Sequence, residues 1–547
     1  MAEDYLYRYQ QDLRNINEPV FELSDEMFEH CLLDLNDIFA DHRYDLKTME
    51  GFCSIFPNVD TRANSNTNHS NTYERMHALL YTQSLEAHDP NLLPFNESQA
   101  LVYNTIREAT FQANLQDPRI FFIDGPGGTG KTFVFNALLD CVRQSENIAI
   151  AVASSGTAAL LLKGGRTAHS TFKTPLEVTT TTMCDMSPRS SIALFVQRSK
   201  LIVWDECSMI SKNLIETVDR SFRDIMKIDA PFGGCLMVFG GDFCQVLPII
   251  PKASRSVIVS QCLNKANFWP QVRSLQLRTN MRVQQALQSD DTNHDAELQQ
   301  FASFLLNVGQ GDVPTVTLPR NIPSDFISIP QEMIIPGDNL LNLIRHVYCD
   351  IANNVHNHNY LMGRAILTTK NKDVKAINNL LLDCLPGQKT SYMSSDEACN
   401  DENQLEMPVE LLNSIENGSL PPHILDLKIG SPIMVIRNID PAAGVCNGTR
   451  LIVNSLRTNF IEAIIATGPN MGDVTLIPKI KFISLATEGS SSYDFQRTQF
   501  PVRLAFAMTI NKAQGQTLQS VEVCTFHVMS SATANFMWHY RGFVPQH

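Results

Sequence analysis

A glycine-rich loop between an apolar strand and a helix constrains this chain more than any other feature. The stretch FFIDGPGGTGKTFVFNALL runs from Phe121 to Leu139. Its centre fits the pattern GxxxxGK[ST], in which glycines let backbone N–H groups face phosphates without a Cβ in the way. The helix that follows adds the positive end of its dipole. The loop predicts an α/β domain that binds a nucleoside triphosphate through Gly125, Pro126, Gly127, Gly128, Thr129, Gly130, Lys131 and Thr132.

The chemistry of hydrolysis needs further groups, and a second motif supplies them. We expect Lys131 to reach the β- and γ-phosphates and the Thr132 hydroxyl to bind Mg²⁺. In LIVWDE, four apolar residues predict a buried strand that ends at Asp205 and Glu206. There Asp205 can hold Mg²⁺ and Glu206 can polarise the attacking water. An acidic pair after a strand can also be a helix cap, but downstream of a phosphate loop it favours hydrolysis over kinase-like transfer.

Three polar groups on other segments are candidates for the same site. VFGGDFCQVLP is a further strand ending in polar residues, and it predicts Asp242 and Gln245 as sensors of the γ-phosphate. Arg282 in LRTNMR is a candidate for stabilising charge on the transferring phosphoryl group. Gln99 in FNESQ carries a donor and an acceptor on one amide, which suits the edge of adenine.

A turn rich in short polar residues follows the second predicted strand. In SSGTAALLLKGGRTAHSTFKTP, the side chains of Thr167, His169 and Ser170 are candidates for contacts to phosphodiester oxygens. Phe172 has two interpretations: it can stack on a base, or it can pack in the core, which is the commoner role of such a side chain.

The 547 residues are enough for three or four domains. Short runs rich in Ile, Val, Phe and Leu alternate with helical segments from Leu93 onward, as a parallel sheet requires. A second strand-and-helix set begins at RAILTT, and short strands with Gly, Asn and Pro turns predict a small β-barrel inserted in it. The expected units are a partly helical extension with an Asn-rich linker at 1–92, a first α/β domain at 93–282, a second at 283–429 and 501–547, and the barrel at 430–500.

Charge and cysteine usage narrow the function classes. The net charge of −14 argues against a protein that binds polyanions through bulk charge, although a local groove can still be basic. The 13 cysteines form no CxxC pair, which is typical of a reducing compartment. No apolar run reaches membrane-spanning length and no secretory signal is evident. We therefore expect a soluble intracellular protein with no membrane partner.

Taken together, the motifs resemble those of the petite-integration-frequency (PIF) helicases, ATP-driven DNA motors of helicase superfamily one. The order FNESQ, GPGGTGKT, SSGTAALLLKGGRTAHSTFKTP, WDECSM, GGDFCQVLP, LRTNMR and TINKAQGQTL is that family's order, over about Leu93 to Val523. Stretches such as PVELLNSIENGSLPPHILDLKIGSPIMVIRNID look closest to the helicase part of Helitron transposons. The nickase signature of full-length Helitron proteins is missing from this sequence, so we predict no DNA cutting.

The resemblance implies an α/β fold of two RecA-like P-loop NTPase domains with ATP and Mg²⁺ between them and a small wedge at about 172–195. It implies single-stranded and forked DNA as partners, movement from five-prime to three-prime, a monomer, and work in DNA repair, recombination and telomere maintenance. We expect a nuclear location, with a mitochondrial one as the alternative. The residues that it implies couple ATP to DNA are Lys512, Gln514, Gly515, Gln516 and Thr517.

Two departures from the family pattern favour an alternative function. Cys244 stands where the family has Arg, and after Val523 the sequence CTFHVMSSATANFMWHYRGFVPQH replaces a block whose final Arg is a second arginine finger. Removal of one phosphate-stabilising Arg can cost orders of magnitude in turnover. The alternative is a degenerate, Helitron-derived protein that binds ATP and DNA but turns over weakly. A P-loop kinase or GTPase fits poorly, because it has no use for HSTFKTP or NKAQGQTL.

Overall fold

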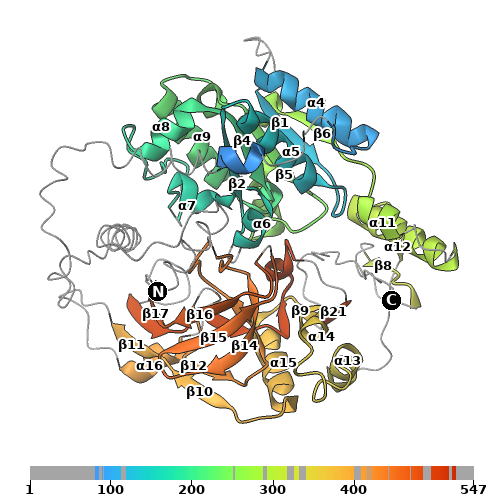
Figure 1. Cartoon of the computed structure of the whole chain (residues 1–547), viewed down its shortest axis with the longest axis vertical. Helices are drawn as coiled ribbons and strands as arrows, with labels where there is room; N and C mark the ends of the chain where they lie inside the picture. Colours follow the sequence, from blue (N-terminus) through green and yellow to red (C-terminus); the bar gives the residue numbers. More distant parts are fainter. Residues whose placement is uncertain are drawn as a thin grey trace, which may run out of the picture. The chain divides into compact units, whose positions relative to one another are not determined.

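The computed structural model describes most of the chain from residue 80 onward (Figure 1). The described residues are 80–85, 89, 92–111, 119–175, 177–250, 253–286, 292–316, 326–331, 340–398, 408–415, 418, 420–441, 443–468, 470–484, 494–516 and 520–524. Most of the predicted N-terminal extension and the tail after Cys524 lie outside these ranges. Among the described residues, no helix combines the length and the apolar character needed to cross a membrane.

A six-stranded parallel sheet forms the centre of the first lobe, which we define as residues 92–286. Its strand order is β3-β2-β4-β5-β1-β6. Five of the strands fall on the apolar runs that predicted them, whereas β3 has only two residues and no apolar run. The strands are β1 (Ile120–Asp124), β2 (Ile148–Ala153), β3 (Arg166–Thr167), β4 (Ser199–Asp205), β5 (Met237–Gly241) and β6 (Arg273–Gln276).

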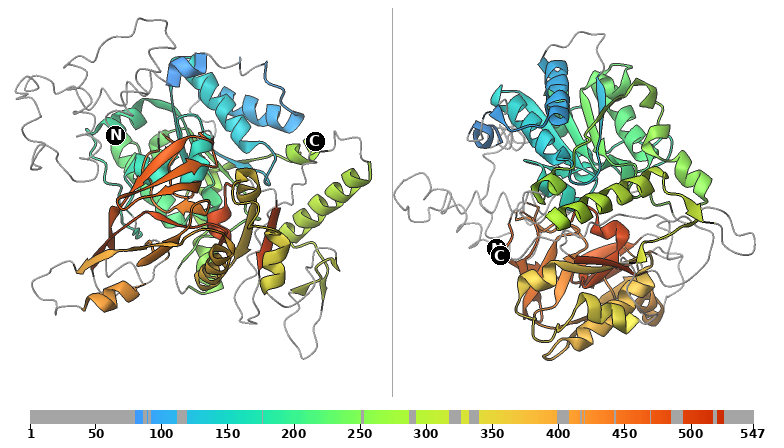
Figure 2. Two further views of the ribbon diagram at one scale, coloured as in Figure 1. Left: turned by 60° about the horizontal axis from the view of Figure 1, so that its bottom comes forward. Right: turned by 90° about the vertical axis from the view of Figure 1, so that its right-hand side faces the viewer.

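Helices cover both faces of this sheet, as the right-hand view of Figure 2 shows. They are α4 (Glu97–Phe111), α5 (Lys131–Gln144), α6 (Gly156–Leu161), α7 (Ala168–Phe172), α8 (Ser191–Arg198), α9 (Lys212–Met226) and α10 (Arg255–Ser260). Short 3₁₀ turns are η4 (Cys207–Met209), η5 (Pro231–Gly234), η6 (Leu263–Lys265) and η7 (Trp269–Gln271). The predicted wedge region therefore consists of the end of α7, turns, and the start of α8.

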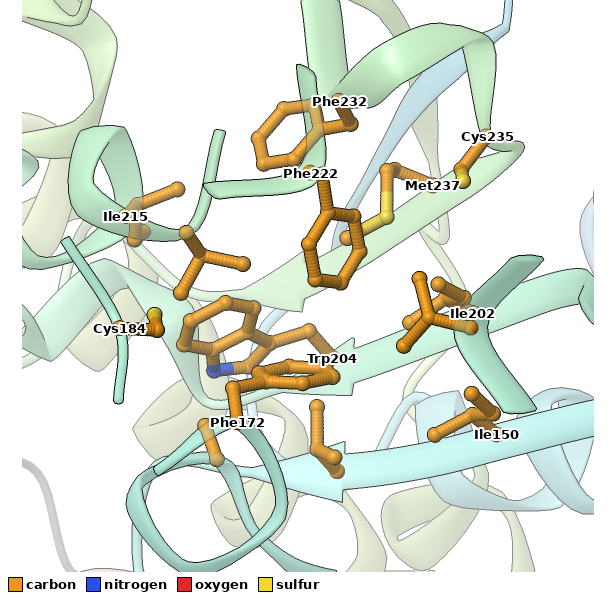
Figure 3. Close-up of a cluster of buried hydrophobic side chains, with 14 of the residues drawn as sticks. Ile150, Phe172, Cys184, Ile202, Trp204, Ile215, Phe222, Phe232, Cys235 and Met237 are labelled. Atoms are coloured by element: carbon orange, nitrogen blue, oxygen red, sulfur yellow. The ribbon is translucent and has the colours of Figure 1, made fainter. Parts of the chain in front are cut away.

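The two faces of the sheet carry separate hydrophobic cores because side chains alternate along each strand. On β4, Ile202 and Trp204 enter one core with residues of α8 and α9, while Leu201 and Val203 enter the other with residues of α5. Figure 3 shows the first of these cores around Trp204. Burial on both faces explains why the strands read as continuous apolar runs.

The second lobe is built on a smaller parallel sheet of order β20-β9-β21. Its strands are β9 (Arg364–Thr368), β20 (Ala507–Thr509) and β21 (Ser520–Cys524). The helices packed with it are α13 (Leu340–Val347), α14 (His358–Met362) and α15 (Asn371–Cys384). The helix expected over NKAQGQTL is instead the short 3₁₀ turn η10 (Ile510–Ala513) in the described part of that segment. The elements that precede this lobe are α11 (Met281–Ala286), α12 (Thr292–Gln310), β7 (Thr315–Val316) and β8 (Phe326–Ile327).

An antiparallel, β-rich insertion interrupts the second lobe. Its largest sheet has the order β16-β15-β14-β13-β19, and smaller sheets join β10 to β12 and β11 to β18 and β17. The elements are β10 (Thr390–Met393), β11 (Ser395–Ala398), α16 (Val409–Ser414), β12 (Ile424–Leu427), β13 (Pro432–Val435), β14 (Arg450–Leu456), β15 (Phe460–Ile465), β16 (Val474–Pro478), β17 (Ile480–Ser484), β18 (Phe495–Gln499) and β19 (Val502–Leu504).

The limits of this insertion differ from the predicted 430–500. The strands begin at Thr390 and end at Leu504, because β10 pairs with β12, β11 pairs with β18, and β19 pairs with β13. β10 and β11 read TSYM and SDEA, which contain no apolar run that would have predicted strands. Pairing with partners far along the chain, rather than local sequence, forms these two strands.

Candidate active site

The phosphate loop follows β1 and leads directly into α5. Gly128 and Gly130 have φ of +87° and +84°, a region that favours glycine. The Lys131 side chain is buried, and its Nζ donates to the carbonyl of Gly125 at 2.5 Å and weakly to that of Pro126 at 3.5 Å. The ammonium therefore lies within the turn of the loop, where a phosphate would compete with backbone carbonyls for it.

Gln99 braces this loop from α4. Its Nε2 donates to the carbonyl of Thr129 at 3.0 Å, and its Oε1 accepts from the backbone N–H of Asn96 at 3.1 Å. A Cβ at Gly130 would lie only 2.5 Å from the Gln99 Nε2, so the close approach needs glycine. Both ends of the amide are engaged by the backbone, which is a bracing role that the sequence did not predict. The contact of Gln99 with adenine stays a prediction.

Four carboxyl groups gather at the carboxyl edge of the sheet. Asp124 ends β1, Asp205 ends β4, and Asp242 follows β5, which lies between those two strands. Burial raises the pKa of Asp124, and Asp242 raises it further. Burial also raises the pKa of Asp205, while the Lys131 ammonium opposes that rise. Asp124 was not predicted, although its place at the end of a buried strand before the loop was a usable signal.

Glu206 is the most constrained of these acids. Its backbone has φ of +53°, unusual for a residue other than glycine, and such strained positions cluster at functional sites. Burial, with the neighbouring Asp205 as the second cause, raises the pKa of Glu206 to about 7. Its Oε2 is buried with no hydrogen-bond partner. On the neighbouring strand, a Cβ at Gly240 would lie 2.9 Å from Oδ1 of Asp205, so the small residue there leaves room for that carboxylate.

A hydrogen-bonded chain joins this edge to the second lobe. Gln245 Nε2 donates to Asp242 Oδ2 at 3.0 Å, and Gln245 Oε1 accepts from Gln514 Nε2 at 3.4 Å. Beside Gln245, the backbone N–H of Cys244 donates to Asp242 Oδ1 at 2.9 Å, so the Cys at the family's Arg position keeps the turn. The structure thus brings together Gln245 and Gln514, which were predicted from different motifs.

Arg282 lies over the phosphate loop. Its Cγ and Cδ would each lie 3.2 Å from a Cβ at Gly128, and its guanidinium belongs to an exposed side chain. Asn280 positions this segment, since its Oδ1 accepts from the backbone N–H of Arg282 at 3.1 Å and its Nδ2 donates to the carbonyl of Gly127 at 3.4 Å. The backbone N–H of Met281 also donates to the carbonyl of Gly128 at 2.9 Å. The segment after β6 is therefore fixed to the loop that it was predicted to serve.

The stacking role considered for Phe172 is wrong. Phe172 is fully buried, with its ring centroid 5.8 Å from that of Trp204 and 5.2 Å from that of Phe222 (Figure 3). No face of the ring is available to a base, and the core interpretation holds. Its apolar surface belongs to the core beneath α7, and the adjacent polar residues do not change that.

The other candidates for DNA contact have mixed surroundings. Thr167 caps α7 by accepting from the backbone N–H of Ser170 at 3.4 Å, and Ser170 itself is exposed. Burial lowers the pKa of His169. Burial, with Arg503 as the second cause, lowers the pKa of Lys512 to about 8. Thr517 lies outside the described residues. Contacts of these residues with DNA stay predictions.

Close contacts between the lobes involve residues that sequence reasoning missed. Thr157 at the start of α6 faces two glycines: a Cβ at Gly448 would lie 2.8 Å from its Cγ2, and a Cβ at Gly515 would lie 3.1 Å from its Oγ1. A Cβ at Gly156 would lie 2.8 Å from the carbonyl oxygen of Asn447. Gln516 Nε2 donates to the carbonyl of Gly448 at 3.1 Å. The first lobe, the turn before β14 and the 515–516 segment therefore meet at one point.

The fold and the loop define the class of protein: a P-loop protein with a RecA-like core. Residues 94–318 match the model of the PIF1-like helicase family, and residues 410–456 match the 2B domain of DNA helicase Pif1. The chain carries the PIF1-like helicase domain and the Pif1 2B domain, and the family resemblance drawn from the motifs is confirmed. The likeness to Helitron proteins stays a prediction.

Relatives match over most of the described chain. The ATP-dependent DNA helicase PIF1 of Danio rerio is 25% identical over 444 residues, which cover 78% of this chain and 57% of that protein. The Homo sapiens protein of the same name is 24% identical, with 78% and 57% covered. The Campylobacter jejuni Pif1 is 25% identical, with 75% and 84% covered. The chain thus spans somewhat more than half the length of the vertebrate relatives it matches.

Solved structures show the same fold. The Pif1 helicase from Bacteroides in complex with ADP-AlF3 and single-stranded DNA matches with a TM-score of 0.53 at 21% identity, covering 80% of this chain and 87% of that one. The Pif1 helicase from Candida albicans matches with a TM-score of 0.51 at 19% identity, covering 79% and 89%. These likenesses establish that the two parallel-sheet lobes and the β-rich insertion form a known architecture.

Proposed function

We propose that this chain is an ATP-driven motor that moves along single-stranded DNA and opens duplex DNA ahead of it. The observation that carries the proposal is the hydrogen bond from Gln514 in the second lobe to Gln245 in the first. Gln245 is held by Asp242 at the carboxyl edge that carries the phosphate loop. A group placed to respond to the γ-phosphate is therefore joined to the lobe that must move. The five-prime to three-prime direction rests on the family resemblance alone.

The side chains of the first lobe divide the chemistry between them. Lys131 exchanges the carbonyl of Gly125 for the β- and γ-phosphates, since a phosphate is the stronger acceptor for an ammonium. Glu206 orients the attacking water and accepts its proton. Arg282, beside Gly128, supplies positive charge where the phosphoryl group is transferred. Gln245 reports the presence of that group to Gln514.

The residues at this edge fit a Mg²⁺ ion. Burial raises the pKa of Asp124, Asp205 and Glu206, and Glu206 Oε2 is buried without a partner, so a cation would relieve unfavourable burial of charge. We propose that Thr132 and Asp205 hold the ion, which would neutralise charge on the phosphates. The described side chains include no cluster of three His, Cys, Asp or Glu groups able to coordinate a metal. The remaining ligands would be water and phosphate oxygens, as Mg²⁺ prefers.

The relatives support the choice of nucleic acid. They are named ATP-dependent DNA helicases, and a structure of two coordinating Pif1 helicases concerns forked duplex DNA. We propose single-stranded and forked DNA as partners of this chain, with a monomer as the working form. Roles in DNA repair, recombination and telomere maintenance, and a nuclear location, are proposals that rest on the family resemblance.

The test is ATP hydrolysis with and without single-stranded DNA, beside strand displacement on forks that carry either a five-prime or a three-prime tail. We expect DNA to stimulate hydrolysis, Lys131→Ala to abolish it, and only the five-prime-tailed fork to be opened. Lys200→Ala is the matched control, because Lys200 is exposed at the amino end of β4, away from the carboxyl edge. Equal displacement on three-prime tails alone would reverse the proposed direction.

A second candidate function is an ATP- and DNA-binding protein with weak or no turnover. The observation that favours it is Cys244, which stands where the family has Arg and adds no positive charge beside Asp242. The sequence after Val523, which departs from the family, points the same way. Tight binding of ATP and of DNA without hydrolysis in the wild-type chain would support this candidate and exclude the motor.

A further inference from the structure

A basic pocket lies in the first lobe outside the nucleotide site. Its volume is about 670 Å³, and it is lined by Lys212, Arg255, Ser256, Val259, Ser260 and Lys265. Three elements form it: the start of α9, the helix α10 and the turn η6. The backbone N–H of Lys212 donates to the carbonyl of Gln261 at 2.8 Å and holds the start of α9 against the end of α10. The pocket is therefore built between anchored elements.

Charge distinguishes this pocket from the rest of the surface. The chain has 57 acidic and 43 basic residues, yet three cations and no acidic side chain line the pocket. Among the described residues, Lys212, Arg255 and Lys265 form no ion pair with an acid. Like charges gathered without counter-charges repel one another and raise the local positive potential. Such a pocket is suited to an anionic ligand.

The position of the pocket indicates which anion. α9 begins shortly after β4 ends, and α10 follows the loop that leaves β5, so both elements continue from the carboxyl ends of strands. In parallel α/β sheets, ligands bind outside those ends. The same loop carries Asp242 and Gln245, and the backbone N–H of Asp242 donates to Ser208 Oγ at 3.3 Å, just before α9. The pocket is thus connected through short segments to the γ-phosphate sensor.

We propose that this pocket binds phosphodiester groups of nucleic acid, a site that rests on the proposed function as a DNA motor. Arg255 and Lys265 are exposed and can reach separate backbone phosphates, while Lys212 is half-buried at the base. The Val259 side chain offers an apolar wall for a sugar. A pocket of this volume with three separated cations matches a stretch of backbone better than one phosphate ion. The site grips DNA without reading its sequence, since phosphates carry none.

The test measures affinity for single-stranded DNA against salt concentration. The variant Arg255→Gln/Lys265→Gln removes two exposed cations that have no printed hydrogen bond to the core, so folding is preserved. Each lost phosphate contact on a single strand lowers the slope of log K against log salt by about 0.7, so we expect a fall of about 1.4. The affinity for ATP should not change, because neither residue contacts the phosphate loop.

The matched control is Lys200→Gln/Lys227→Gln, which removes the same charge at the amino end of β4 and beyond the far end of α9. We expect the control to keep the wild-type slope. A pocket variant that keeps the wild-type slope, in a wild-type chain that binds DNA and hydrolyses ATP in response to it, overturns this inference and leaves the proposed function intact. A wild-type chain that binds no DNA overturns both.

Discussion

Gly448 provides the sharpest test of the contact between the lobes. Its φ is +96°, and a Cβ built there would lie 2.8 Å from Cγ2 of Thr157, which belongs to α6 of the first lobe. Gly472 serves as a matched control in the same β-rich insertion, since its φ is +100° and nothing lies within 4 Å of its Cβ position. The two glycines have the same backbone demand, but only Gly448 lies against the other lobe.

The expected cost of Gly448→Ala has two parts. The left-handed conformation costs an L-residue roughly 1–2 kcal/mol, and Gly472→Ala should pay the same amount. Forcing a methyl group into a filled contact costs about 1–3 kcal/mol more. Because that second part opposes the approach of the lobes, we expect DNA-stimulated turnover to fall about 5- to 150-fold in Gly448→Ala. Gly472→Ala should lower the melting temperature and leave turnover unchanged.

The assay is steady-state ATP hydrolysis with single-stranded DNA, beside thermal unfolding of each variant. Adding Thr157→Ser to Gly448→Ala removes Cγ2 and leaves Oγ1 at 3.7 Å as the nearest atom of that side chain, so most of the lost turnover should return. The Thr157→Ser single variant corrects for any effect of its own. Equal turnover in Gly448→Ala and Gly472→Ala, or no recovery in the double variant, would refute the reasoning.

Three other substitutions test individual residues. Phe172→Ala should lower the free energy of unfolding by about 3–5 kcal/mol, measured with denaturant, without weakening DNA binding by the folded protein; a specific loss of DNA affinity would contradict the core placement. Because burial lowers the pKa of Lys512 to about 8, its positive charge is lost as pH rises through that value, so affinity for single-stranded DNA should fall there in the wild type and stay level in Lys512→Arg. Glu206→Gln should retain ATP binding, measured by calorimetry, while turnover falls about 100- to 10,000-fold; near-normal turnover would exclude Glu206 as the base.

The first lobe was predictable because its strands are buried on both faces. The run KLIVWDE corresponds closely to β4 (Ser199–Asp205), and RIFFID to β1 (Ile120–Asp124). The edges of the β-rich insertion were not predictable in this way. β10 and β11 have polar sequences and form strands only because β12 and β18 provide partners. Local patterns reveal strands that bury their own side chains and miss strands defined by their pairing.

The same division holds for the candidate site. Lys131, Asp205 and Glu206 lie in short motifs whose spacing reflects the chemistry of a triphosphate, so sequence could identify them. The role of Gln99 could not be read, because its amide binds the carbonyl of Thr129 and that contact depends on how α4 packs. Nothing near Thr157 in the sequence indicates that Gly448 faces it. Contacts between distant segments leave no local signal.

A short path connects the metal-site acid to the second lobe. Ser154 donates through both its backbone N–H and its Oγ to the carbonyl of Asp205, each at 3.2 Å. Ser155 Oγ lies 3.2 Å from Thr157 Oγ1, which donates to the carbonyl of Gln514 at 3.4 Å. These hydrogen bonds are long and individually weak, so they cannot transmit much force. The steric contact of Thr157 with Gly448 is short and stiff by comparison. A shift at the end of β4 would therefore reach the second lobe mainly by pushing on that contact, which is why the Thr157→Ser rescue tests the coupling directly.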